Sequence, residues 1–127
     1  FGEWEGLTAP EAYERYGEGF RAWDEGIVRA PGGESLTDVV TRMRSFVEDL
    51  AAEQARLCAE EDVPRTIAIV SHSVAIKSIV AAAMDMPPST VAHVWPIPAS
   101  LTLLQLRVAP DGELVEGHLL ALGVPTS

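Results

Sequence analysis

Cysteine and long apolar runs are nearly absent from this sequence. Cys58 is the only cysteine, so the chain cannot form an internal disulfide bond, which is typical of a reducing compartment and predicts a cytoplasmic protein. No apolar run reaches the roughly 18 residues that a membrane-spanning helix needs, and no basic segment precedes an apolar one as in a leader. These absences predict a soluble domain with no membrane partner.

Basic side chains are also scarce. Nine Lys and Arg residues stand against nineteen Asp and Glu residues, which gives a formal net charge of −10 at pH 7 and a pI near 4.6. Such a surface repels the phosphate backbone of nucleic acids and anionic lipid headgroups, so we expect neither as a partner. An anionic substrate must therefore be held by a local site that acts against the overall field.

Metal-binding and nucleotide-binding patterns are missing as well. His72, His93 and His118 lie far apart, none belongs to an H-E-x-x-H pattern, and Cys58 has no second cysteine to accompany it. Gly32 and Gly33 are not followed by the lysine that a P-loop requires. The sequence therefore predicts no metal site and no nucleotide loop.

Capping residues mark two helix starts. Thr8 with Glu11 three residues later is a capping-box pattern, and Gly17 and Gly19 predict the end of that helix. Ser35 with Asp38 predicts a similar start for the longest helix. Apolar residues recur at helical spacing along the longest helix and predict its buried face. They are Leu36, Val39, Val40, Met43, Phe46, Val47 and Leu50.

The second half of the chain adds strands. The β-branched run Thr66–Val70 predicts a strand buried on both faces, as in a parallel sheet, and Val74–Met84 predicts an apolar helix. Leu101–Val108 and Leu114–Leu122 predict two strands joined by the turn at 110–112. With 47% hydrophobic residues in 127, the chain is expected to be a single α/β domain with one antiparallel edge.

The segment Ser71-His72-Ser73 joins the predicted buried strand to the following helix. Ligands of parallel α/β sheets bind beyond the carboxyl ends of the strands, where the amino end of a helix also attracts anions. A histidine there can bind an anion, transfer protons or carry a phosphoryl group. It is equally possible that His72 is a loop residue with no catalytic role and that the two serines beside it only cap the helix.

The same residues allow a second chemistry. Ser71 to Ala75 is a variant of the G-x-S-x-G nucleophile elbow, with Ser73 as nucleophile. Asp85 or Asp111, followed by His118, would complete a triad in the right chain order. Both glycines of the elbow are replaced here by larger residues, which clash in its strained turn, so this alternative is the weaker one.

Three segments together resemble the histidine phosphatase superfamily. They are Phe1–Thr8 (FGEWEGLT), Pro31–Leu36 (PGGESL) and Ile69–Ser73 (IVSHS), and they stand in the family's order and approximate spacing. The resemblance is to the phosphoglycerate mutase-like group, and within it to the broad-specificity and alpha-ribazole phosphatases. It implies an α/β three-layer sandwich with a mainly parallel sheet and an antiparallel edge.

The resemblance also implies a mechanism and roles for single residues. In this family a histidine of an Arg-His-Gly motif attacks the phosphoryl group, a carboxylic acid protonates the leaving oxygen, and no cofactor takes part. By motif position, His72 resembles the second, phosphate-stabilising histidine, and Ser73 stands where the family has glycine beside the phosphate. Glu34 is expected to orient its loop and the start of the long helix, and Arg42 to pair with Asp38 at i,i+4.

The chain departs from the family pattern at its beginning. No Arg-His-Gly occurs in these 127 residues, so the first strand, the nucleophile, the phosphate-binding arginines and the acid are expected upstream of Phe1. Without that strand, Thr66–Val70 would keep an open edge, and an isolated fragment is expected not to fold.

Three functions follow from these patterns. The first is hydrolysis of a small phosphorylated metabolite through a phosphohistidine intermediate. The second is a mutase that moves phosphate between carbons, and the third is a non-catalytic, phosphatase-like binding domain. Trp4 and Trp23 are expected to pack in the core; Trp95 is also expected there, with a homodimer contact as the alternative.

Overall fold

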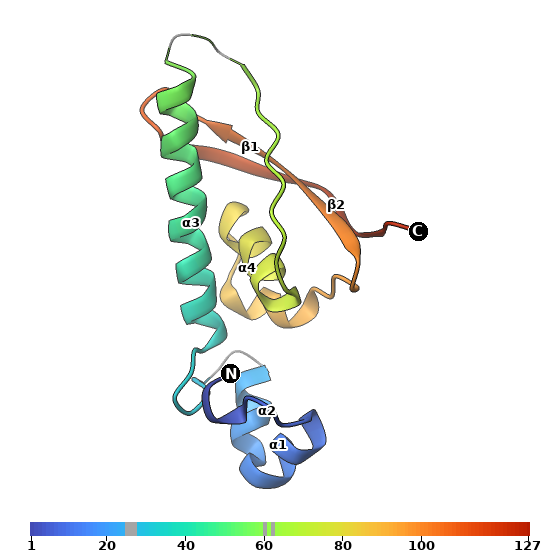
Figure 1. Ribbon diagram of the computed structural model, residues 1–127. Helices are drawn as coiled ribbons and strands as arrows, with labels where there is room; N and C mark the ends of the chain where they lie inside the picture. Colours follow the sequence, from blue (N-terminus) through green and yellow to red (C-terminus); the bar gives the residue numbers. More distant parts are fainter. Residues whose placement is uncertain (25–27, 60, 62) are drawn as a thin grey trace.

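The computed structural model describes residues 1–24, 28–59, 61 and 63–127, and Figure 1 shows their arrangement. The elements, in chain order, are η1 (Gly2–Trp4), α1 (Ala9–Tyr16), α2 (Glu18–Asp24), α3 (Leu36–Leu57), α4 (Ser73–Ala83), η2 (Pro88–His93), β1 (Ser100–Val108) and β2 (Leu114–Pro125). The first helices, α1 and α2, gather near the end where α3 begins, whereas the β1–β2 hairpin lies along α3 and α4 (Figure 1). None of the helices in these ranges is long and apolar enough to cross a membrane.

Both predicted capping boxes are confirmed. The Thr8 backbone N–H donates to the Glu11 carboxylate over 2.7 Å, and the Glu11 N–H donates to the Thr8 hydroxyl over 3.4 Å. At the start of α3, the Ser35 N–H donates to Asp38 over 2.8 Å and the Asp38 N–H donates to the Ser35 hydroxyl over 3.1 Å. Helix α1 ends at Gly17, as predicted.

The buried side of α3 is shifted slightly from the predicted stripe. Phe46 is exposed, and Ala51, which the prediction omitted, is buried. Successive residues of a helix are about 100° apart, so Phe46, one position before the buried Val47, falls at the border of the apolar face. The small Ala51 allows close packing instead. The side chains of α3 that are buried are Leu36, Val39, Val40, Val47 and Ala51.

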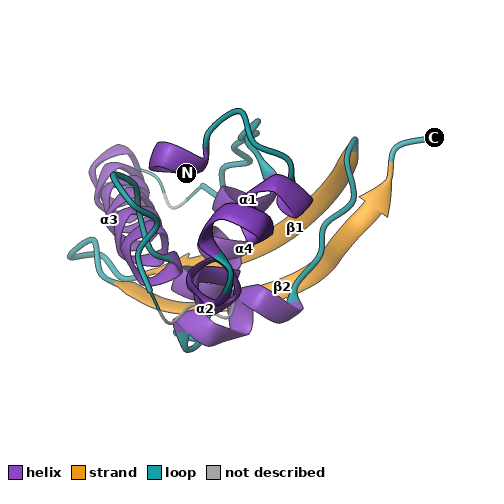
Figure 2. Cartoon of the chain, turned by 90° about the horizontal axis from the view of Figure 1, so that it is seen from below, coloured by secondary structure: helices purple, strands orange, loops and turns teal. Residues whose placement is uncertain are grey.

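The C-terminal hairpin is antiparallel, as predicted, and β2 runs to Pro125, beyond its predicted end. Helices α3 and α4 lie on one face of it (Figures 1 and 2). Burial alternates along β1 accordingly, since Leu104 and Leu106 are half-buried while Leu101 and Leu103 are exposed. The hairpin therefore has an inner face covered by helices and an apolar outer face that no described element covers.

The predicted strand at Thr66–Val70 is wrong for the described chain. These residues have no regular secondary structure, all of them are exposed, and Val70 is 100% exposed. The segment runs as an unpaired connection from α3 to α4 (Figure 1). A β-branched run becomes a buried strand only between neighbouring strands, and the sheet that the structure describes contains only β1 and β2. The parallel sheet and the three-layer sandwich stay predictions.

Two of the three tryptophans are in the core, as expected, and the third is not. Trp4 and Trp23 are buried, with ring centroids 5.7 Å apart in an edge-to-face arrangement. Phe20 joins this cluster at 5.3 Å from Trp4. Trp95 is 69% exposed, so its predicted core position is wrong. It lies between η2 and β1, where Pro96 and Pro98 interrupt regular structure and the connection stays at the surface.

Candidate functional site

His72 occupies the N-cap position of α4. Its backbone is extended (φ −114°, ψ 159°), and its carbonyl accepts the first helical hydrogen bond, from the Ile76 N–H, over 2.9 Å. Its side chain is exposed and makes no capping hydrogen bond to the helix. The imidazole is therefore available to a ligand at the amino end of α4.

The first turn of α4 presents backbone donors at the same place. No hydrogen bond joins the N–H groups of Ser73, Val74 and Ala75 to any acceptor within the described ranges. Unsatisfied N–H groups and the positive end of the helix dipole attract anions. Val74 packs against the hydrophobic core and so fixes the direction of this helix end. With His72, these groups can hold a phosphoryl group.

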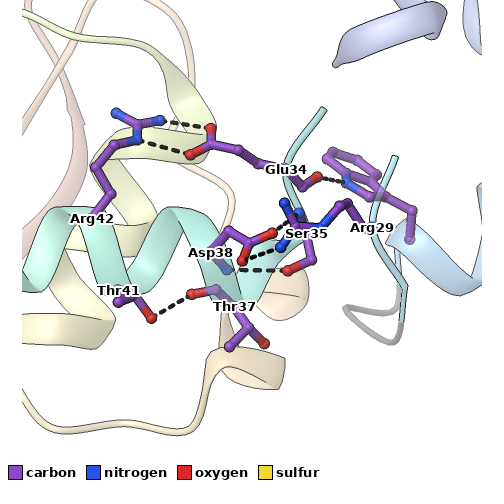
Figure 3. Close-up of polar contacts among 8 residues, drawn as sticks. Arg29, Glu34, Ser35, Thr37, Asp38, Thr41 and Arg42 are labelled. Carbon is purple, nitrogen blue, oxygen red and sulfur yellow. Dashed lines mark hydrogen bonds and ion pairs between the residues drawn. The ribbon is translucent and has the colours of Figure 1, made fainter. Parts of the chain in front are cut away.

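The start of α3 carries an ion pair that the sequence reasoning assigned wrongly. Arg42 does not pair with Asp38 but with Glu34, in a bidentate contact of 2.9 Å from Nε and 2.8 Å from Nη2 (Figure 3). The hydrogen bond from Arg42 holds the pKa of Glu34 below its usual value, and Glu34 raises the pKa of Arg42. The Glu34 backbone carbonyl also accepts from the Trp23 indole over 2.8 Å, a contact that does not depend on the Glu34 side chain.

Asp38 has two partners other than Arg42. It completes the capping box with Ser35 and accepts from Arg29 over 2.9 Å (Figure 3). The hydrogen bonds from Ser35 are the main reason that the pKa of Asp38 lies below its usual value. Arg29 and Arg42 are therefore both engaged by carboxylates of this chain.

The first two motif segments lie against each other. The Glu3 N–H donates to the Pro31 carbonyl over 2.8 Å. A Cβ on Gly33 would come within 2.8 Å of the Gly2 nitrogen, and Gly2 itself has φ of 58°, in the left-handed region that favours glycine. The glycines of both motifs thus allow the two backbones to approach closely.

The third motif segment lies at the same end of the molecule. Helix α4 starts toward the end of α3 where Ser35 caps it (Figure 1). Val74 packs against the hydrophobic cluster that contains Leu36 and Val40 from the first turns of α3 and Ala81 and Ala82 from the last turns of α4. No contact joins His72 directly to Glu34 or Arg42 in the described part of the chain.

The geometry does not support the serine triad. Gly117, the neighbour of His118, packs against the Ala83 carbonyl at the last turn of α4, whereas Ser73 begins that helix. Ten residues of helix separate the two ends by about 15 Å. Asp85 follows the same last turn, where it pairs with Arg44 over 3.1 Å. 

The other candidate acid of the triad, Asp111, accepts from the Glu113 N–H over 2.9 Å within the hairpin turn.

Within the described ranges, no group of three or more His, Cys, Asp or Glu side chains is arranged to hold a metal ion.

The chain thus combines helices and strands, a histidine at the open amino end of a helix, and two glycine-bearing motifs that pack against each other. The chain belongs to the histidine phosphatase superfamily (branch 1), whose family pattern matches residues 1–116. The family inferred from the three motifs is thereby confirmed.

Several relatives of this chain carry the names of phosphatases. Glucosyl-3-phosphoglycerate phosphatase of Mycobacterium tuberculosis is 31% identical over 96 residues, which are 75% of this chain and 41% of the relative. Phosphoserine phosphatase 1 of Hydrogenobacter thermophilus is 32% identical over 87 residues, covering 67% of this chain and 37% of the relative. The chain thus spans less than half the length of these relatives.

Solved structures give the same result for the fold. A structure named mycobacterial hydrolase 2 superimposes with a TM-score of 0.81 at 26% identity, covering 99% of this chain and 56% of the other. Mycobacterial glucosyl-3-phosphoglycerate phosphatase in complex with inorganic phosphate has a TM-score of 0.77 at 26% identity, over 98% of this chain and 59% of the other. The described elements therefore have the arrangement of a family member.

One buried charged side chain of α4 was not predicted from the sequence. Lys77, in the second turn of α4, is 6% exposed although it is charged. A signal was present, because Lys77 is the only lysine in the sequence and stands within an otherwise apolar helix. The bidentate Glu34–Arg42 pair was missed for another reason, since helical spacing considers only partners within the same helix.

Proposed function

We propose that this chain is the C-terminal part of a single phosphatase domain that hydrolyses phosphate monoesters through a phosphohistidine intermediate. The observation that carries the proposal is the position of His72 at the amino end of α4, where its side chain makes no capping hydrogen bond. Membership of the superfamily supports it, as do the names of the phosphatase relatives.

In the proposed reaction, a histidine nitrogen attacks phosphorus while the bond from phosphorus to the ester oxygen breaks. The leaving oxygen takes a proton from a carboxylic acid, and water then displaces the histidine to release inorganic phosphate. We place the nucleophile and the acid in sequence N-terminal to Phe1. His72, as a hydrogen-bond donor, and the N–H groups of Ser73, Val74 and Ala75 stabilise the phosphoryl oxygens during both transfers.

The proposed substrate is a small phosphorylated metabolite. We propose that clustered cationic donors and backbone amides stabilise the phosphate charge, with no metal and no cofactor. A cytoplasmic location and a homodimer stay predictions from the sequence. A phosphatase releases inorganic phosphate from a simple aryl phosphate, whereas a mutase does not. Release of inorganic phosphate therefore distinguishes the two activities.

Replacement of His72 by Ala in the full-length protein tests the proposal. Turnover of an aryl phosphate should fall by about 10²-fold or more, because one preorganised donor to the transferring group is lost. His118→Ala is the matched control, since His118 is an exposed histidine of β2 near the other end of α4. Equal turnover of both variants and the unmodified protein would refute the role of His72.

Two further outcomes separate the alternatives. Phosphate release that persists in excess EDTA supports the metal-independent mechanism, and loss of release in EDTA contradicts it. Phosphate transfer within the substrate, without release, would establish the mutase instead. Binding of phosphate with no turnover of any ester would establish the non-catalytic domain.

A further inference from the structure

We draw no further inference here: the strongest candidate, the cavity of about 700 Å³ between α3, the last turn of α4 and the turn end of the β1–β2 hairpin, rests on a cluster of exposed acidic side chains (Glu48, Asp85, Glu113 and Glu116), and no second observation in the part of the chain that the structure describes points to a ligand for it.

Discussion

The beginnings of α3 and α4 are built differently although they lie at the same end of the molecule. At α3, Ser35 and Asp38 satisfy each other's backbone N–H groups, and Arg29 binds the outer side of Asp38. At α4, the N-cap residue is His72, and no side chain closes the helix. A capping box stabilises a helix start and also fills the place where an anion binds. The open start is therefore the one suited to a ligand.

We infer that the start of α3 contributes to stability and that the start of α4 contributes to phosphate binding. At α3, removal of a side chain should cost folding free energy and leave phosphate binding unchanged. At α4, removal of a donor should cost phosphate binding and leave folding nearly unchanged.

After His72→Ala, the largest effect is expected from Ser73→Pro. Proline is tolerated at the first position of a helix, and His72 before it already has the extended backbone that a following proline requires. The substitution removes one N–H from the open start, so turnover in the full-length protein should fall by about 10²-fold with little change in melting temperature.

Ser73→Ala is the control for this variant, because it removes the hydroxyl and keeps the N–H. Equal losses in the two variants would contradict a role for the backbone donor. An unchanged rate for Ser73→Pro would show that the amino end of α4 does not bind the transferring group.

A smaller effect, on stability alone, is expected from Ser35→Ala. It breaks the capping box of α3, which should lower the free energy of unfolding by about 1 kcal/mol. Urea denaturation measures the change, and Ser45→Ala, on the exposed side of α3, is the matched control. If Ser35→Ala lost phosphate affinity without losing stability, the claim that the start of α3 serves stability and the start of α4 serves binding would be contradicted.

The smallest effect is expected from Glu34→Gln, which breaks the bidentate pair with Arg42. Both side chains are partly exposed, so the loss should be about 0.5 kcal/mol at neutral pH. The pKa of Glu34 is lowered in the folded state, so its stabilising effect is present above the ordinary value of 4.5 and is lost as the pH falls through the lowered pKa.

Urea denaturation of Glu34→Gln and the unmodified protein across this range checks the sign. The difference in unfolding free energy should be largest above pH 4.5 and shrink below it. A difference that grows as the pH falls would contradict the ion pair as its cause.

Local signals in the sequence were sufficient for the helix starts and the hairpin. Capping boxes and turns depend on residues within four positions of each other, so the Thr8 and Ser35 starts could be predicted. The placement of His72 between an extended segment and a helix followed from the same local patterns, and the three motifs identified the family.

Features that depend on distant partners could not be predicted in this way. Thr66–Val70 has the composition of a buried strand, but strand pairing is a property of its neighbours. Arg42 has a suitable partner within its helix, yet a loop residue eight positions earlier presents the better bidentate geometry. Trp95 is apolar, but its surroundings, including the Lys77 ammonium, come from elsewhere in the fold.

The most direct test of the central claim is an NMR titration of the ¹⁵N-labelled full-length protein with inorganic phosphate. The account predicts saturable shifts of the amide signals of Ser73, Val74 and Ala75 at the open start of α4. The amides of Glu11 and Asp38, which are bonded within capping boxes, should not shift. Phosphate binding that leaves the three α4 amides unmoved would contradict the claim that this helix end holds the phosphoryl group.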